Sequence, residues 1–382
     1  MRTVRIVGGG LAGATVAYSL GQAGLRVEVV EADATWGGQL RTAGANGILY
    51  EPTGAHIFHT GDEAVWRLVT RLVTMRPYRH RVQAEVFDRV LSWPPQLSEL
   101  RDLPQWTAIE RELALRPSRP RADNFEVWCV DLMGETLYRA YIEGYTRKQW
   151  GIEPADLAAA WAPRRIELRS DDIRELFRDP YQGWPVGGYT GLVDALLAAV
   201  PVTLGQRLTV QDWDELCRDV DAVVLTCALD EFFGESLGRL PWRGVALRSR
   251  YVPEVDHILP CGVLNTPSPE HPYTRAIETK WMSGQSLPGT VVSYEYPGAA
   301  ARHYPVDDVE GANRRLQQRY EEELAALPGP PRYLAGRLAT YTYIDMDQVV
   351  RQGLNAARRL LADLTDRPAP RPRAAPAVSS VR

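Results

Sequence analysis

Three glycines near the start of the chain have the spacing of a phosphate-binding turn. Gly8, Gly10 and Gly13 follow an apolar, β-type run at residues 4–7 and precede a helical pattern at residues 14–20. The first glycine permits a sharp turn, the second lets a pyrophosphate approach the main chain, and the third lets the helix pack against the strand. The free N–H groups at the start of that helix would then face the phosphates.

An acidic residue completes this motif. A second β-type run at residues 27–30 leads into Glu31, where a carboxylate can accept hydrogen bonds from ribose hydroxyls. The order of strand, glycine turn, helix, strand and acid predicts a dinucleotide site rather than a chance cluster of turn glycines. This stretch alone leaves the identity of the dinucleotide open.

The composition is that of an ordinary soluble globular protein. The 382 residues are too many for one compact core and predict two or three domains. The net charge of −4 gives no reason to expect a nucleic acid or an acidic membrane as a partner. The four cysteines and six histidines lack the spacing of a metal site or a disulfide framework. With no signal peptide and no apolar run of membrane-spanning length, we expect a cytoplasmic protein with reduced thiols and no metal.

The predicted elements indicate an α/β fold with a discontinuous Rossmann-like dinucleotide-binding domain. This domain would comprise residues 1–80, 186–235 and 328–366, because the glycine turn and the later buried-strand pattern belong to one parallel sheet. Residues 367–382 are rich in Pro, Ala and Arg and predict a disordered tail. A ligand cleft between the domains is expected.

The sequence predicts that the chain leaves this domain twice, to form two further domains. Helix-forming residues dominate 95–185 and predict an inserted helical domain, with a mobile, densely charged loop at about 162–180. Residues 81–94 and 240–310 are rich in β-branched and aromatic residues and predict an antiparallel sheet domain that binds substrate. Helical patterns outside and inside these domains lie at residues 62–75, 106–115, 125–139, 154–161, 192–200 and 346–364.

Several short motifs follow the opening turn, in a fixed order, from Arg5 to about Leu364. They are Gly37-Gly38, GAHIFHT at 54–60, GYTRKQWG at 144–151, YQGWPVGGYT at 181–190, PYTR at 272–275, YPV at 304–306 and GRLATYTYIDM at 336–346. Together with the opening unit, they resemble the UDP-galactopyranose mutases. These flavoenzymes are isomerases that interconvert the pyranose and furanose forms of UDP-galactose.

The resemblance implies that the opening site binds FAD, which is active when reduced. The reduced flavin would attack the anomeric carbon, displace UDP and form a covalent flavin–sugar adduct, within which the sugar ring opens and recloses. An external reductant would keep the flavin reduced. The cofactor-binding residues implied are Gly8, Gly10, Leu11, Gly13, Glu31, Gly38, Gln39, His56, Arg337, Asp345 and Met346.

The resemblance also implies a UDP-sugar site. A pyrophosphate calls for arginine forks and hydroxyl donors, and Arg169 on the charged loop and Arg275 would clamp it from two sides. His56 and His59 would shape the sugar pocket or tune the flavin, and these four residues form the implied catalytic set. The implied substrate-binding residues are Tyr145, Trp150, Tyr181, Tyr304, Tyr343, Asn265, His80 and Tyr141.

Some positions depart from the family pattern. Gln39 stands where an Asn is expected, and His80 and Tyr141 leave the sugar, and less so the base, open. A competing hypothesis is therefore the same mutase chemistry on a UDP- or dTDP-deoxyhexose. Two further hypotheses are a net FAD oxidoreductase and a non-catalytic flavin-binding protein. The resemblance suggests a homodimer.

Overall fold

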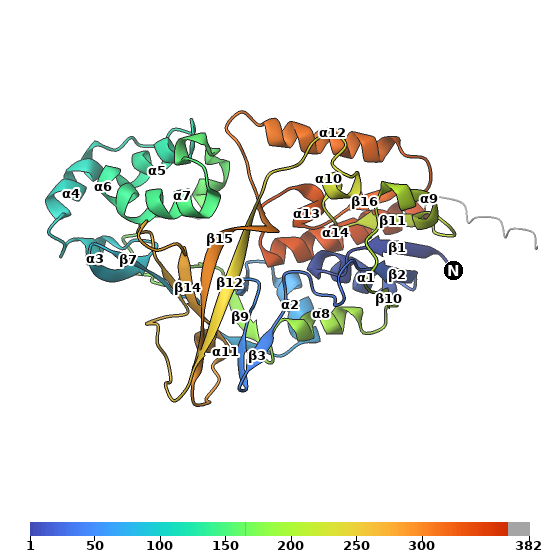
Figure 1. The fold of residues 1–382 in the computed structure, drawn as a ribbon, viewed down its shortest axis with the longest axis horizontal. Coiled ribbons are helices and arrows are strands. Elements are labelled where there is room, and N and C mark those ends of the chain that lie inside the picture. Colours follow the sequence, from blue (N-terminus) through green and yellow to red (C-terminus); the bar gives the residue numbers. More distant parts are fainter. Residues whose placement is uncertain (165, 366–382) are drawn as a thin grey trace, which may run out of the picture.

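The computed structural model describes residues 1–164 and 166–365 (Figure 1). The predicted tail at 367–382 lies outside the described residues. The helices of residues 97–150 gather at one end of the molecule, long strands occupy the middle, and the N-terminal parallel sheet with its own helices lies at the other end (Figure 1). None of the helices in the described part of the chain is both long and apolar enough to cross a membrane.

A five-stranded parallel sheet forms the Rossmann-like region. Its order is β10-β2-β1-β11-β16, with β1 in the middle between β2 and β11. Because alternate side chains of a strand point to opposite faces, this sheet contributes to two separate cores. The bounds are β1 Thr3–Val7, β2 Arg26–Val30, β10 Val202–Thr203, β11 Ala222–Leu225 and β16 Arg332–Leu334.

Helices cover both faces of this sheet. One group of helices packs against Val4 and Ile6 on one face, and a second group packs against Val7 and Leu225 on the other face. The first group is α1 Leu11–Gln22, α8 Thr190–Leu197 and α14 Met346–Thr365. The second group is α9 Trp213–Leu216, α10 Leu229–Phe232 and α12 Ala312–Ala326.

A six-stranded sheet occupies the middle of the molecule. Its order is β12-β15-β14-β13-β7-β8, and every pairing is antiparallel except that of β7 with β13. The predicted antiparallel sheet is therefore correct except at the seam where its two separate chain segments meet. The bounds are β7 Val82–Val86, β8 Arg89–Trp93, β12 Trp242–Val252, β13 Val263–Asn265, β14 Arg275–Glu278 and β15 Thr290–Pro305.

Residues 181–185 do not belong to the helical region, contrary to the predicted boundary at 185. They form β9 Tyr181–Pro185, which pairs with β5 and β6 in a three-stranded sheet. The extended Tyr-Gln-Gly-Trp-Pro segment joins these strands because Gly183 lets their main chains approach closely: a Cβ there would lie 2.7 Å from the Arg76 carbonyl oxygen. The remaining short elements here are β3 Ala43–Ala45, β4 Ile48–Tyr50, β5 Phe58–Thr60, α2 Glu63–Leu72, β6 Met75–Pro77, η4 Val210–Asp212, α11 Lys280–Ser283 and α13 Arg337–Thr340.

The helical region has its own core, and two of its predicted helices need correction. The helix predicted at 125–139 is interrupted at Gly134, whose φ of 84° is incompatible with a continuous right-handed helix. The helix predicted at 154–161 is replaced by two 3₁₀ turns. The elements are α3 Leu97–Leu100, α4 Trp106–Leu115, α5 Phe125–Met133, α6 Glu135–Leu137, the π-helical segment η1 Tyr138–Glu143, α7 Gly144–Trp150, η2 Pro154–Asp156 and η3 Ala159–Arg164.

Candidate active site

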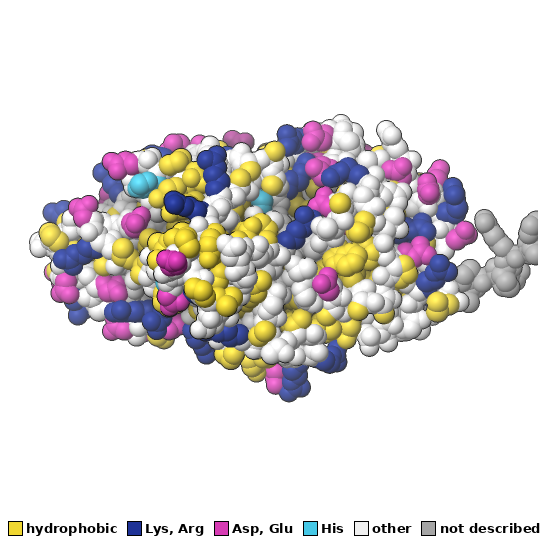
Figure 2. Space-filling view, turned by 60° about the horizontal axis from the view of Figure 1, so that its bottom comes forward, with side chains coloured by type: hydrophobic (Ala, Val, Ile, Leu, Met, Phe, Trp, Pro, Cys, Tyr) yellow, Lys and Arg dark blue, Asp and Glu magenta, His cyan; other side chains and the backbone are white. Residues whose placement is uncertain are grey.

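One cavity of about 300 Å³ lies where the three regions meet. The helical region contributes α7, the six-stranded sheet contributes the ends of β13, β14 and β15, and residues 53–57 and 343–346 approach from the Rossmann-like side. Hydrophobic side chains gather near the middle of the face in Figure 2, and charges of both signs are scattered around them. A concave site between domains is the usual place for a ligand.

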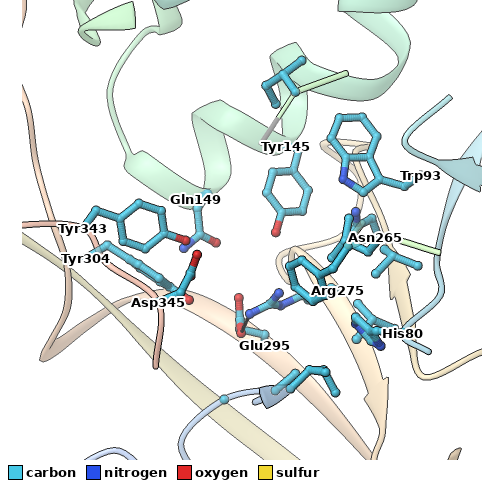
Figure 3. A pocket seen from close by; sticks show the side chains of 18 of the residues that line it. His80, Trp93, Tyr145, Gln149, Asn265, Arg275, Glu295, Tyr304, Tyr343 and Asp345 are labelled. Carbon is cyan, nitrogen blue, oxygen red and sulfur yellow. Dashed lines mark hydrogen bonds and ion pairs between the residues drawn. The ribbon is translucent and has the colours of Figure 1, made fainter. Parts of the chain in front are cut away.

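Arg275 and Glu295 form an ion pair at the centre of the cavity (Figure 3). An Arg275 nitrogen lies 2.7 Å from Glu295 Oε2, and the Glu295 side chain is fully buried. Among the described residues, the buried Nε of Arg275 has no hydrogen-bond partner, so part of this guanidinium remains available to a ligand. Burial would lower the pKa of Arg275, but Glu295 together with Tyr145 and Tyr304 outweighs this effect and holds the pKa above its usual range.

Three tyrosines from three separate segments surround this ion pair. Tyr145 comes from α7, Tyr304 from β15 and Tyr343 from the segment after α13. The Tyr304 and Tyr343 rings meet edge to face at 5.4 Å, and the Arg337 guanidinium lies over both, 5.7 and 5.1 Å from their centroids. Burial raises the pKa of Tyr145 to about 12 and that of Tyr304 further, so both hydroxyls stay protonated and can donate to an anion.

A flat, mostly apolar part of the cavity lies under the helical region. Trp150 is 8% exposed, and its ring centroid is 6.1 Å from that of Tyr304. Tyr141 is 3% exposed, its ring lies 5.9 Å from that of Trp93, and its hydroxyl has no hydrogen-bond partner within the part of the chain that the structure describes. Aromatic surfaces with one free polar group suit a planar base.

Two histidines line the opposite part of the cavity. His80 is almost fully buried, and burial, aided by Arg275 and His59, lowers its pKa to about 3, so its ring is neutral. The His59 ring stacks on Phe177 at 3.5 Å, and its Nδ1 lies 2.7 Å from Asp179 Oδ2. The neutral His80 imidazole and the nearby Asn265 amide can exchange hydrogen bonds with sugar hydroxyls.

Arg169 lines the cavity, but its guanidinium is already occupied. Its Nε lies 2.5 Å from Glu167 Oε2, and its two terminal nitrogens donate to the carbonyls of Ile173, Glu175 and Leu176. The side chain is 1% exposed. These bonds use four of its five N–H groups, and clamping of a ligand by Arg169 stays a prediction.

Tyr181 is not among the residues that line the cavity in this structure, and its role in substrate binding stays a prediction. It lies on β9, and its ring stacks on Trp66 with a centroid separation of 5.6 Å. Pairing of β9 with β5 fixes this orientation, because neighbouring residues of a strand point to opposite faces.

The glycine turn has the form that a pyrophosphate requires. Gly8 has a φ of 104°, and a Cβ on Gly13 would lie 2.0 Å from the Gly8 carbonyl oxygen. Gly10 precedes α1 without a side-chain cap, and a Cβ on Gly38 would lie 3.4 Å from the Gly10 Cα. The start of α1 is thus bordered by main chain, as a bound pyrophosphate needs.

Glu31 has a structural role in the same turn. Its Oε2 accepts the Gly9 N–H at 2.6 Å, and its Oε1 accepts the Asp33 N–H at 2.8 Å. Each carboxylate oxygen has a second lone pair, so the predicted hydrogen bonds to a ribose remain compatible with this geometry. The carboxylate therefore also orients the turn.

The remaining predicted cofactor residues are divided between the turn and the cavity. Leu11 opens α1, whereas the cavity is lined by Gln39, His56, Arg337, Asp345 and Met346. The His56 main-chain N–H donates to Glu51 Oε2 at 2.8 Å, and Gln39 Nε2 donates to the Arg302 carbonyl at 2.7 Å.

The comparisons with known proteins agree with this architecture. A family model described as UDP-galactopyranose mutase matches residues 140–343, more than half of the chain. The chain belongs to the UDP-galactopyranose mutase family. A second model, an NAD(P)-binding Rossmann-like domain, matches residues 6–72 and includes the glycine turn.

Relatives of this mutase family match almost the whole chain. A dTDP-fucopyranose mutase of Escherichia coli is 29% identical over 378 residues, covering 94% of this chain and 98% of that protein. A probable UDP-galactopyranose mutase of Klebsiella pneumoniae is 29% identical over 378 residues, covering 96% of both. A crystal structure of reduced UDP-galactopyranose mutase matches with a TM-score of 0.76 at 15% identity, over 95% of this chain and 96% of that one. The structural match confirms the predicted fold.

Sequence reasoning missed several residues of this mutase-family cavity. The most important is Glu295, which lies among apolar and aromatic residues of β15. A single acidic residue in such a strand has to be paired when buried, and this signal could have identified it. Trp93 and Phe177 also line the cavity and had no motif to mark them, whereas Gln149 lies within the 144–151 motif but was not singled out.

Proposed function

We propose that this protein is an isomerase that interconverts UDP-galactopyranose and UDP-galactofuranose with reduced FAD. The observation that carries the proposal is the convergence of Arg275 with Tyr145, Tyr304 and Tyr343 in one cavity of a chain of this family. A guanidinium and protonated hydroxyls are the donors that a diphosphate needs.

The glycine turn supports FAD as the bound dinucleotide. Gly8, Gly10 and Gly13 would hold the pyrophosphate at the start of α1, and Gln39 and His56 line the cavity toward which the rest of the cofactor would extend. When bound and reduced, the flavin would supply the nucleophile for the anomeric carbon.

The protein residues would bind the diphosphate, orient the sugar and stabilise the leaving UDP. Arg275 and the tyrosine hydroxyls would hold the diphosphate and stabilise the negative charge that develops as UDP leaves the sugar. Neutral His80 and Asn265 would orient sugar hydroxyls, and burial of the cavity would exclude water from the reacting carbon. Arg169 would add a second cation after leaving its carbonyl partners.

A second candidate is the same chemistry on a dTDP-deoxyhexose. The E. coli dTDP-fucopyranose mutase and the K. pneumoniae relative are both 29% identical to this chain, so overall similarity does not separate them. The free Tyr141 hydroxyl in the base region and His80 in the sugar region are the positions at which substrate choice would be made.

Turnover by the purified protein tests both candidates. The protein, with its flavin reduced by dithionite, is offered UDP-galactofuranose or dTDP-fucofuranose, and products are separated by chromatography. We expect conversion of UDP-galactofuranose only with reduced flavin. Faster turnover of the dTDP sugar would favour the second candidate, and turnover coupled to consumption of an electron acceptor would contradict both.

We also propose that the protein acts as a cytoplasmic homodimer whose flavin is reduced by an external donor. The resemblance to the family supports this assembly. Light scattering of the purified protein should give twice the mass of one chain, and a single-chain mass would contradict the dimer.

A further inference from the structure

Lys148 makes an unusual set of contacts beside the cavity. Its ammonium lies 2.5 Å from the Thr266 carbonyl oxygen, 2.7 Å from that of Ser268, 3.2 Å from that of His271 and 2.9 Å from that of Tyr273. Within the described residues, no carboxylate forms an ion pair with it. Four carbonyl dipoles that point toward one another need a cation between them.

The segment that supplies these carbonyls connects two cavity residues. It joins β13 to β14, and the paired residues Asn265 and Arg275 stand at its two ends. The Thr266 N–H donates to the Thr274 carbonyl at 2.8 Å, which closes the base of the loop. The loop is therefore continuous at both ends with residues that line the cavity.

The helix that carries Lys148 supplies the opposite wall. Tyr145 lies three residues before Lys148, and Gln149 directly follows it; both point from α7 into the cavity (Figure 3). Gly144 fits this helix closely against the loop, since a Cβ there would lie 2.4 Å from the Pro267 carbonyl oxygen. The helix and the loop thus meet through a glycine contact and one ammonium group.

The far end of α7 is fixed in a different way. Arg243 donates from Nε to the Gln149 carbonyl at 2.8 Å and from Nη2 to the Lys148 carbonyl at 3.0 Å. These bonds satisfy carbonyls that the end of a helix leaves free. With its end held by Arg243, the helix can transmit the position of Lys148 to Tyr145.

We propose that Lys148 is a positioning residue that locks the 266–273 loop to α7, so that Arg275 and Tyr145 face the same diphosphate. Lys148 itself would not touch the substrate. The inference rests on the proposed function, because it assumes that a diphosphate binds at Arg275. Replacing the ammonium by a thioether would leave four carbonyls without their donor and let the loop separate from the helix.

The chain offers a matched control in Lys280. This lysine is 1% exposed, and its ammonium lies 3.0 Å from the Asp256 carbonyl oxygen, 2.6 Å from that of Leu287 and 3.0 Å from that of Gly289. It also pairs with the Asp256 carboxylate, and it is not among the residues that line the cavity. Lys280→Met therefore removes a similarly bonded lysine, from the six-stranded sheet region, without touching the cavity walls.

The test compares Lys148→Met with Lys280→Met in the flavin-loaded full chain. We expect both variants to lower the melting temperature and to keep their flavin. Lys148→Met should bind UDP at least about tenfold more weakly than wild type, and its KM should rise by a larger factor than its kcat falls. The UDP affinity of Lys280→Met should stay within about twofold of that of wild type. Lys148→Arg keeps the hydrogen-bond donors and the positive charge, so its UDP affinity should lie between those of wild type and Lys148→Met. Unchanged UDP affinity in both Lys148 variants would overturn the proposal.

A measurement without ligand separates this inference from the proposed function. Amide hydrogen exchange at residues 266–275 should accelerate at least about tenfold in Lys148→Met relative to Lys280→Met. If wild type binds no UDP, the proposed function fails, and the exchange data still decide whether Lys148 holds the loop. Equal exchange in the two variants would overturn the positioning role.

Discussion

The start of α1 and the surroundings of Arg275 are both suited to phosphate groups, but they use different parts of the chain. The first offers main-chain N–H groups within one continuous motif, where Gly8, Gly10 and Gly13 keep side chains away. The second offers a guanidinium and tyrosine hydroxyls from α7, β14, β15 and the segment after α13. A main-chain site has no room for a side chain, whereas a side-chain site can be adjusted residue by residue.

The largest effect is expected at Gly13 in the main-chain site. In Gly13→Ala the new Cβ would lie 2.0 Å from the Gly8 carbonyl oxygen, so the strand and helix must separate. We expect a loss of more than about 3 kcal/mol of stability and no retained flavin, measured by the ratio of flavin to protein absorbance.

Gly21→Ala on the same helix is the control for this prediction. A Cβ at Gly21 meets nothing within 4 Å. The variant should keep its flavin and gain about 0.5–1 kcal/mol. If Gly13→Ala retained flavin as well as Gly21→Ala does, the close main-chain approach would not be required.

The next effect is expected at Arg275 in the side-chain site. Arg275→Met leaves the fully buried Glu295 without its cation, which should cost about 3 kcal/mol of stability and abolish measurable UDP binding while flavin remains bound. The double variant Arg275→Met/Glu295→Met should recover stability but not UDP binding. Calorimetry and urea unfolding give both quantities, and recovery of UDP binding in the double variant would contradict the role of Arg275.

A smaller, pH-dependent effect is expected at His80. Its pKa of about 3 in the folded protein lies below its ordinary value of 6.5, so the unfolded chain binds the extra proton first as the pH falls. His80 should therefore lower stability by about 2 kcal/mol between pH 7 and pH 5. Urea unfolding of His80→Asn should lack this loss, whereas the exposed His271→Asn should retain it. Identical pH profiles for wild type and His80→Asn would contradict the prediction.

The smallest effect is expected at Tyr141. If its free hydroxyl donates to a bound base, Tyr141→Phe should bind UDP about fivefold more weakly, equivalent to about 1 kcal/mol. Tyr138→Phe, on the same π-helical segment but outside the cavity lining, should leave UDP affinity unchanged. Equal or tighter UDP binding by Tyr141→Phe would show that the base does not use this hydroxyl.

The fold was predictable wherever it depended on local pattern. The helix at 106–115 and the long helix from Met346 have the expected starts, because amphipathic spacing is visible in a short window. The break at Gly134 and the 3₁₀ turns after Pro154 were missed, because they depend on how neighbouring helices pack. Gly134 illustrates this, since a Cβ there would lie 2.6 Å from Glu112 Oε2.

The candidate site was predictable only in part. Motifs identified several polar residues that line the cavity, including Arg275 and Tyr343, whereas the structure places Tyr181 outside this lining. A motif records which residues occur together and does not record which way a strand turns them. Pairing of β9 with β5 and β6 directs the Tyr181 ring toward Trp66.

By itself, the sequence determined the glycine turn, the Rossmann-like domain and the family, since these depend on residues close together or on motifs in a fixed order. The tertiary structure decided the partner of Arg275, the occupied state of Arg169 and the contact of Lys148 with the 266–273 loop. Each of these three contacts involves a cationic side chain, and residue type alone does not show which group such a side chain contacts. A cation can pair with any of many carboxylates and carbonyls, and only the packed chain selects which of them lie within reach.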